Sequence, residues 1–224
     1  MGLFSSIYQS KILKKEYTNS LESSYTETKS SKKFIVEKNE TYYNGAAFFH
    51  ELIKDNLSNL VVICIGTDKC IFDSLAPFVG SILKSRGFSL PIYGTIESPI
   101  HAVNIADSLM EIKKNHPNGF FIAIDACFSN KESQFQIHLR NYPIHPGAGV
   151  NKKLPSAGDV SIVGTIAVSN DDVKFSDIRL NDVIHMANKI ADILIEAAKS
   201  DKFDDLHKDN ILNFANFKNN HYFK

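Results

Sequence analysis

Short apolar runs alternate with amphipathic stretches through the middle of the chain. Uninterrupted apolar residues predict strands, at 60–65, 91–96, 120–124 and 161–168. Apolar residues that recur at every third or fourth position predict helices, at about 46–57, 75–87, 102–112 and 180–194. Strands that alternate with helices indicate an α/β fold, a three-layer sandwich around a mainly parallel, twisted sheet.

Residues 134–140 show a different pattern, in which apolar and polar residues alternate strictly. Phe135, Ile137 and Leu139 share one face, and His138 falls on the other. This predicts a half-exposed strand nearer an edge of the sheet, with His138 facing solvent.

The two ends of the chain are poorer in large apolar residues than its middle. We therefore expect a mobile polar segment at 1–43, one α/β domain at 44–199 and a polar tail at 200–224. No run of about 18 apolar residues and no apolar signal region are present, so neither a transmembrane helix nor a secretory signal is expected.

Composition indicates which partners and which cellular compartment to expect. The 25 basic residues balance the 25 acidic ones, which argues against nucleic-acid binding as the main activity. The 3 cysteines contain no CxxC pair, which is typical of a cytoplasmic protein with free thiols rather than of a disulfide scaffold. We expect no membrane partner and no nucleic-acid partner.

Candidate chemistry gathers where the predicted strands end, which is where ligands bind in parallel sheets. Thr67, Asp68 and Asp73 follow the first strand, and Asp125 directly follows the third. Two carboxyl groups held close in a shielded crevice cannot both ionise easily, so one can act as an acid and the other as a base. Alternatively, Asp73 caps the following helix and Asp68 only shapes its turn.

Other side chains could line the same crevice. His101 and Asn104 follow the second strand, and the glycine-rich loop 143–158 offers Asn151 and Lys152 as donors to a substrate backbone or an oxyanion. Neither HExxH nor CxxC is present, so no metal site and no cofactor is expected. The apolar surroundings of Cys127 favour an inert thiol.

Four segments together resemble one known family. They are CIGTDKCIFDSLAPFVGSIL, IYGTIESPIHAVNI, FIAIDACFS and PGAGVNKKLPSAGDVSIVGTI. In this order, over about residues 60–195, they resemble the YyaC-type sporulation proteins of endospore-forming bacteria. That family is similar to the germination protease that degrades small acid-soluble spore proteins, and it shares a fold with the hydrogenase maturation endopeptidases. The resemblance implies a phosphorylase/hydrolase-like sandwich and a peptidase activity.

The resemblance also implies roles for two residues. The germination protease has one essential aspartate in a PDALGP-like segment and another in an IDAL-like segment. The segments FDSLAP and IDAC match these, which makes Asp73 and Asp125 the catalytic acids of an atypical aspartic peptidase. The chain departs from the family pattern at Ala76, where glycine is usual, and in the bulky residues 70–72.

The expected function is therefore a sporulation-associated peptidase in the cytoplasm of the mother cell or forespore. Its substrate would be a protein or peptide, such as the small acid-soluble spore proteins, and the resemblance makes a homo-oligomer an option. One alternative is a non-catalytic binding or scaffold protein that retains the fold. Another is a metal-recognising maturation peptidase, which needs His101 or His138 beside the acid pair.

Overall fold

The computed structural model describes residues 31–129, 131–146, 154–168 and 178–199. The strands are β1 (Lys33–Val36), β2 (Leu60–Cys64), β3 (Ile92–Tyr93), β4 (Phe120–Ser129), β5 (Ile137–Arg140) and β6 (Val160–Val168). The α-helices are α3 (Tyr43–Ile53), α4 (Leu75–Ser85), α5 (Ile105–Asn115) and α6 (Leu180–Ala197). Short 3₁₀ turns cover Lys54–Asn59, Ile71–Ser74 and Lys131–Ser133.

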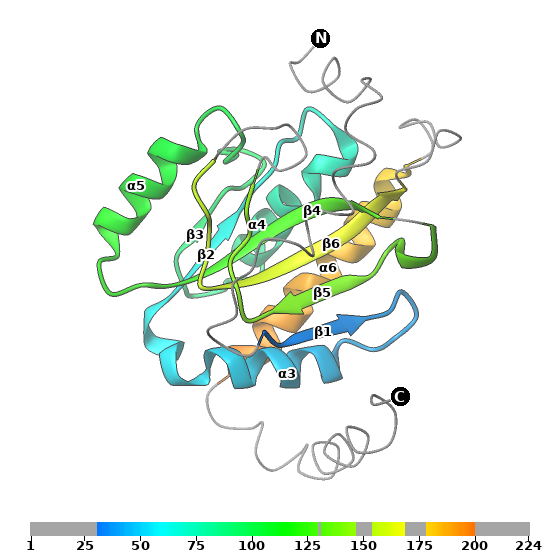
Figure 1. The fold of residues 1–224 in the computed structure, drawn as a ribbon, viewed down its shortest axis with the longest axis horizontal. Coiled ribbons are helices and arrows are strands. Elements are labelled where there is room, and N and C mark those ends of the chain that lie inside the picture. Colours follow the sequence, from blue (N-terminus) through cyan, green and yellow to red (C-terminus); the bar gives the residue numbers. More distant parts are fainter. Residues whose placement is uncertain (1–30, 130, 147–153, 169–177, 200–224) are drawn as a thin grey trace.

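The strands form one six-stranded sheet in the order β1-β5-β6-β4-β2-β3 (Figure 1). β3, β2, β4 and β6 run parallel, whereas β5 and β1 pair antiparallel at one edge. The sheet is thus mostly parallel, and the predicted three-layer α/β class is confirmed. The parallel strands all end at the same edge, which brings their C-terminal turns together.

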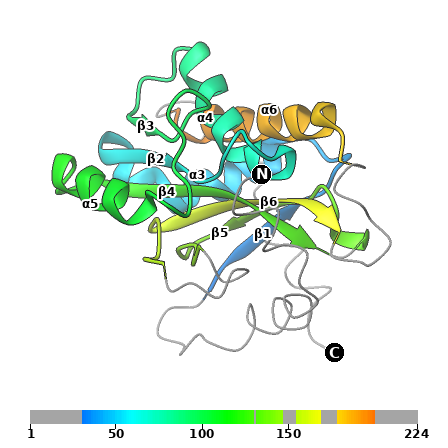
Figure 2. The ribbon, with the colours of Figure 1, turned by 90° about the horizontal axis from the view of Figure 1, so that it is seen from above.

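The two faces of the sheet are covered differently. The face that packs on α3, α4 and α6, here called the helix face, carries the larger apolar core (Figure 2). The other face, here called the opposite face, packs on α5 through a smaller cluster near β2. The side chains alternate along each strand, so β2 sends Val62 to the larger cluster and Val61 and Ile63 to the smaller one.

Several predicted boundaries need correction. β1 was not predicted, since Lys33–Val36 lies within the N-terminal segment assigned to 1–43, yet it pairs with β5 along its whole length. β4 continues through Ser129, beyond the predicted end at 124. β3 keeps only two of the residues predicted at 91–96.

The predicted strand is present as β5, with Ile137 and Leu139 on one face, but its predicted half exposure and the predicted exposure of His138 were wrong. All four residues of β5 are buried, and His138 is only 8% exposed. The reason is that β5 is not at the edge, because β1 pairs along its outer side and β6 along its inner side.

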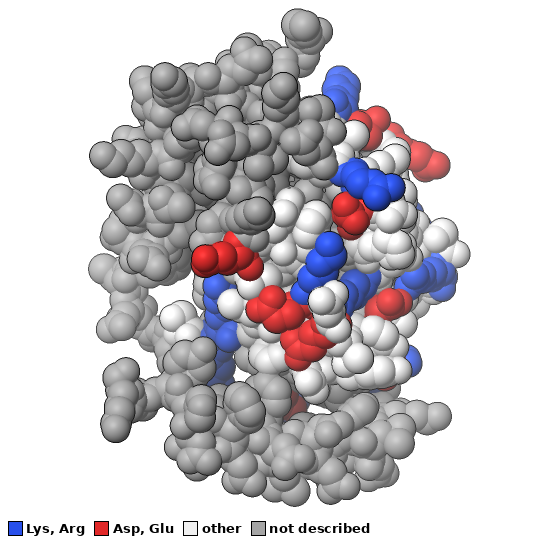
Figure 3. Space-filling model, turned by 90° about the vertical axis from the view of Figure 1, so that its right-hand side faces the viewer, with Lys and Arg blue, Asp and Glu red and all other residues white. Residues whose placement is uncertain are grey.

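The described residues show how charge is distributed on the surface and whether a helix could cross a membrane. Acidic and basic side chains are interspersed over the described part of the face in Figure 3, as the zero net charge would suggest. Across the described ranges, none of the helices combines the length and the hydrophobicity that a membrane crossing requires.

Candidate functional site

The turn between β2 and α4 is folded back on itself at the end of the sheet. Gly66 has φ +152°, and a Cβ atom there would overlap the carbonyl oxygen of Asp73. The N–H of Thr67 donates to that same carbonyl at 3.0 Å. Glycine is therefore needed for both the backbone angle and the close approach, and the turn holds Asp73 against the end of β2.

Aromatic packing ties this turn to β4. The ring of Phe72 lies 4.9 Å from that of Phe128, centroid to centroid. Ala76, which replaces the usual glycine of the family pattern, is fully buried in the first turn of α4 and belongs to the main core. The bulky Phe72 and the methyl group of Ala76 thus fix the loop that carries Asp73 rather than loosen it.

Asp125 lies within β4, between β2 and β6. Its main chain pairs with that of Val163 on β6, and its Oδ1 accepts the N–H of Ala126 at 2.8 Å. Both Asp73 and Asp125 are partly buried. Asp73 does not cap α4, because Ser74 holds the N-cap position and makes no side-chain cap hydrogen bond.

Burial makes both carboxyl groups reluctant to ionise. It raises the pKa of Asp73 to about 7, and a backbone hydrogen bond from Thr67 offsets only part of that effect. It also raises the pKa of Asp125 well above its ordinary value, and the charge of Asp73 raises it further. The N–H of Ala126 and the charge of Arg140 act in the other direction.

The charge of Asp73 acts on Asp125, and the ring of Phe72, next to Asp73 in the chain, packs on Phe128 of β4. Two carboxyl groups from separate segments therefore belong to the same end of the sheet. Burial favours the protonated form of each group, and the charge on Asp73 raises the pKa of Asp125 further. One group can then accept a proton while the other donates one, which is the requirement for adding water to an amide.

The other residues predicted after β2 and β3 have local roles. Thr67 is buried and its Oγ1 accepts the N–H of Lys69 at 3.3 Å, whereas Asp68 is exposed. Asn104 accepts the N–H of His101 through Oδ1 at 2.8 Å, and its Nδ2 donates to the Pro99 carbonyl at 3.0 Å. These bonds shape the loop before α5.

The histidines and cysteines of the described ranges do not gather into a cluster that could bind a metal ion. His101 Nδ1 accepts the N–H of Val103 at 3.3 Å, and His138 interacts with Gln136 and Arg140. No group of three or more His, Cys, Asp or Glu side chains within these ranges could hold a metal ion. Burial raises the pKa of Cys127 to about 12, which favours the neutral thiol. Asn151 and Lys152 lie outside the described residues.

Arg140 was not among the residues predicted to line the site. This residue is buried in β5, and its charge lowers the pKa of Asp125. Its only sequence signal was a basic residue at a polar position of an alternating strand. Without β1, nothing in the sequence indicated that this position is buried.

Comparison with known proteins places this site within a family. The family model described as "Protein of unknown function (DUF1256)" matches residues 33–193, which include β1, Asp73, Asp125 and Arg140. The chain belongs to this DUF1256 family. It is also 43% identical over 136 residues to the "Uncharacterized protein YyaC" of Bacillus subtilis strain 168. That alignment covers 59% of this chain and 66% of the relative, just under two thirds of the relative's length.

Proposed function

We propose that the protein is a peptidase that hydrolyses amide bonds with the pair Asp73 and Asp125. The observation that supports this proposal is that two carboxyl groups at the C-terminal edge of a parallel sheet both have raised pKa values, and that the charge of Asp73 acts on Asp125. Catalytic acids and bases are commonly tuned in this way by burial and by a like charge. The resemblance to the germination protease adds independent support, since its two essential aspartates match these positions.

In the proposed reaction the two carboxyl groups divide the work. Asp73, to which we assign the role of base, takes a proton from a water molecule. The water oxygen then bonds to the carbonyl carbon of the amide, and the protonated Asp125 donates its proton to the substrate. The C–N bond breaks when Asp73 passes the proton that it took from water to the nitrogen. Asp125 takes a proton back from the diol oxygen as the carbonyl re-forms, which gives a carboxylic acid and an amine. General acid and base assistance of this kind is worth about 10²–10⁴-fold in rate.

The proposed setting and substrate come from the resemblance. We propose that the enzyme acts in the cytoplasm of a spore-forming cell, on small acid-soluble spore proteins or on proteins with similar sites. DUF1256 itself carries no assigned activity in its description, so the site chemistry and the resemblance are the grounds for this proposal.

The proposal is tested by incubating purified small acid-soluble spore proteins with the wild type and with Asp125→Asn, followed by mass spectrometry. The substitution keeps the shape of the side chain and removes its acid. The matched control is Asp68→Asn, since Asp68 lies in the same turn as Asp73 but is exposed. We expect defined products from the wild type and the control, and at least about 100-fold less from Asp125→Asn.

Two outcomes would contradict the peptidase. Equal cleavage by Asp125→Asn would place the activity elsewhere or in a contaminant. Absence of products from the folded wild type would favour the alternative of a non-catalytic binding protein.

A further inference from the structure

Arg140 is a buried cation that lacks an anionic partner in the described structure. It is 9% exposed, and no described residue accepts a hydrogen bond from its Nε. Its Nη2 lies 3.4 Å from Nδ1 of His138, and its guanidinium carbon lies 5.6 Å from the ring centroid of Tyr142. Neither contact supplies a negative charge. Buried charges are normally paired, and this one has a donor to spare.

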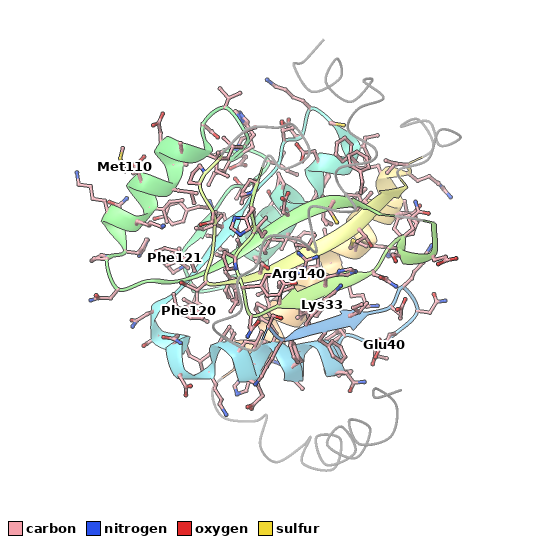
Figure 4. The ribbon with its side chains drawn as sticks, in the orientation of Figure 1. Lys33, Glu40, Met110, Phe120, Phe121 and Arg140 are labelled. Atoms are coloured by element: carbon pink, nitrogen blue, oxygen red, sulfur yellow. The ribbon has the colours of Figure 1, made fainter. Side chains whose placement is uncertain are left out.

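A second cation lies beside it. Lys33 on β1 is the direct cross-strand partner of Arg140 on β5, and Figure 4 labels the two on these adjacent strands. Direct cross-strand partners leave the sheet on the same side. Burial and the charge of Arg140 both lower the pKa of Lys33. Two positive groups are thus held together, where an anion would relieve their mutual repulsion.

His138 orients Arg140 without neutralising it. Burial, followed by the charges of Lys33 and Arg140, lowers the pKa of His138 to about 3, so the ring is neutral at ordinary pH. Its Nε2 is 3.1 Å from Oε1 of Gln136, which only accepts, so this nitrogen carries the proton. Nδ1 is then free to accept from Arg140, and this contact fixes one edge of the guanidinium.

The strand register places this pair near the proposed catalytic acids. Asp125, Val163 and His138 form one row across β4, β6 and β5, and Arg140 lies two residues beyond His138 along β5. With strands about 4.8 Å apart and about 3.4 Å per residue, the Cα atoms of Asp125 and Arg140 are about 12 Å apart. A peptide spans that distance with about three residues.

We propose that Arg140 and Lys33 form a subsite for a carboxylate of the peptide substrate, within about three residues of the bond that is cleaved. This inference rests on the proposed function for the identity of the ligand as a peptide. The carboxylate would pair with the guanidinium, whose buried Nε has no hydrogen-bond partner among the described residues, and with the Lys33 ammonium. It comes either from an acidic side chain or from the C-terminus of the substrate.

Calorimetric titration of the full chain with three peptides tests the subsite. The first is acetyl-Ala-Ala-Ala-Glu-amide, with a side-chain carboxylate only. The second is acetyl-Ala-Ala-Ala-Gln with a free C-terminus, and the third is acetyl-Ala-Ala-Ala-Gln-amide, with no carboxylate. We expect one of the first two to bind at least about 5-fold more tightly than the third, and which one it is identifies the source of the carboxylate. Mass spectrometry of the recovered peptides records cleavage separately.

Substitutions show whether the preference belongs to this pair. Arg140→Gln should abolish it, and Lys33→Gln should reduce it at least about 2-fold. The control is Arg86→Gln, since Arg86 already pairs with Asp192 at 2.6 Å, and it should keep the full preference. If Arg140→Gln fails to fold, Arg140→Lys and the exposed Lys33→Gln serve in its place.

Three results would overturn the subsite: no binding of any peptide, equal binding of all three, or a preference that survives the substitutions at both Arg140 and Lys33. A carboxylate preference without cleavage would support the subsite and contradict the proposed peptidase activity. Cleavage of spore proteins without a carboxylate preference would support the peptidase activity and contradict the subsite.

Discussion

The two faces of the sheet use buried positions for different purposes. On the helix face the strands contribute apolar side chains, such as Ile124, Ile162 and Leu139, to one continuous core. On the opposite face, buried polar side chains follow one another across β6 and β5, namely Ser161, Thr165, His138 and Arg140. The helix face carries the larger apolar core, whereas the opposite face adds to its smaller cluster polar groups that a stable core alone would not need.

Hydrogen bonding separates these polar groups further. Ser161 donates to the carbonyl of Tyr142 at 2.8 Å, and Thr165 Oγ1 lies 3.1 Å from the carbonyl of Gln136. Arg140, by contrast, has an unsatisfied nitrogen, and Asp125 is destabilised in its charged form. The least satisfied groups of the opposite face are thus the ones to which we assign chemistry, as functional sites often show.

The largest effect on stability is expected when an isoleucine that is buried on the helix face is replaced by alanine. The comparison is the same replacement at an exposed isoleucine on the opposite face. Ile162→Ala, at a position that is 0% exposed, should lower the free energy of unfolding by about 2–5 kcal/mol. Ile35→Ala on β1, where the side chain is 36% exposed, should cost less than about 1 kcal/mol. Urea denaturation measures both, and equal losses would remove the contrast between the faces.

The next effect concerns pH. Because the pKa of Asp73 is raised from 3.8 to about 7 in the folded protein, the folded state binds the extra proton between these values. The contribution of Asp73 to stability is therefore full below about pH 4, declines as pH rises and is lost once pH passes about 7. Asp73→Asn removes this decline. The free energy of unfolding of the variant, relative to that of the wild type, should therefore rise by about 2 kcal/mol between pH 5 and pH 8. If this relative value were the same at pH 5 and at pH 8, the burial of Asp73 would be contradicted.

Two glycines with positive φ offer a smaller and more local test. Gly66→Ala would both strain the backbone and overlap the Asp73 carbonyl, whereas a Cβ at Gly87, with φ +70°, meets nothing. Gly87→Ala should cost about 1 kcal/mol, and Gly66→Ala clearly more. Thermal unfolding measures the difference, and only Gly66→Ala should reduce peptide cleavage, because only it displaces Asp73.

The smallest effect is expected at the surface of the helix layer. Arg86 pairs with Asp192 at 2.6 Å and also donates to Asn188, which links the end of α4 to α6. Both charged side chains are 36% exposed, so solvent screens the pair. Arg86→Ala should lower the free energy of unfolding by less than about 1 kcal/mol. A loss comparable with that of Ile162→Ala would show that the helix layer depends on polar links.

Sequence periodicity was sufficient for the elements that contact the core along their whole length. The apolar runs at 60–65 and 161–168 and the stripe at 180–194 correspond closely to β2, β6 and α6. Four-residue β1 gave no such signal, because Lys33–Val36 follows a long polar stretch and has one strongly buried residue. Its pairing with β5 is a tertiary contact between distant segments, which periodicity within one segment cannot reveal.

The candidate site shows the same limit. Asp73 and Asp125 were found from their places after strands and from the family resemblance, since each is a local property of the chain. The burial of His138 and Arg140 depends on β1, so both were expected at the surface or passed over. The unpaired Nε of Arg140 could be recognised only once the neighbours of that side chain were known.

The proposed chemistry depends most directly on the electrostatic coupling of Asp73 with Asp125. An NMR titration that follows the chemical shifts of the two carboxyl carbons as pH changes measures this coupling. We expect Asp73 to titrate near pH 7 and Asp125 well above its ordinary range. In Asp73→Asn the pKa of Asp125 should fall, because a neighbouring negative charge is lost, yet stay raised by burial. Ordinary values near 4 for both groups, or an Asp125 titration that ignores the substitution, would contradict the proposed acid pair.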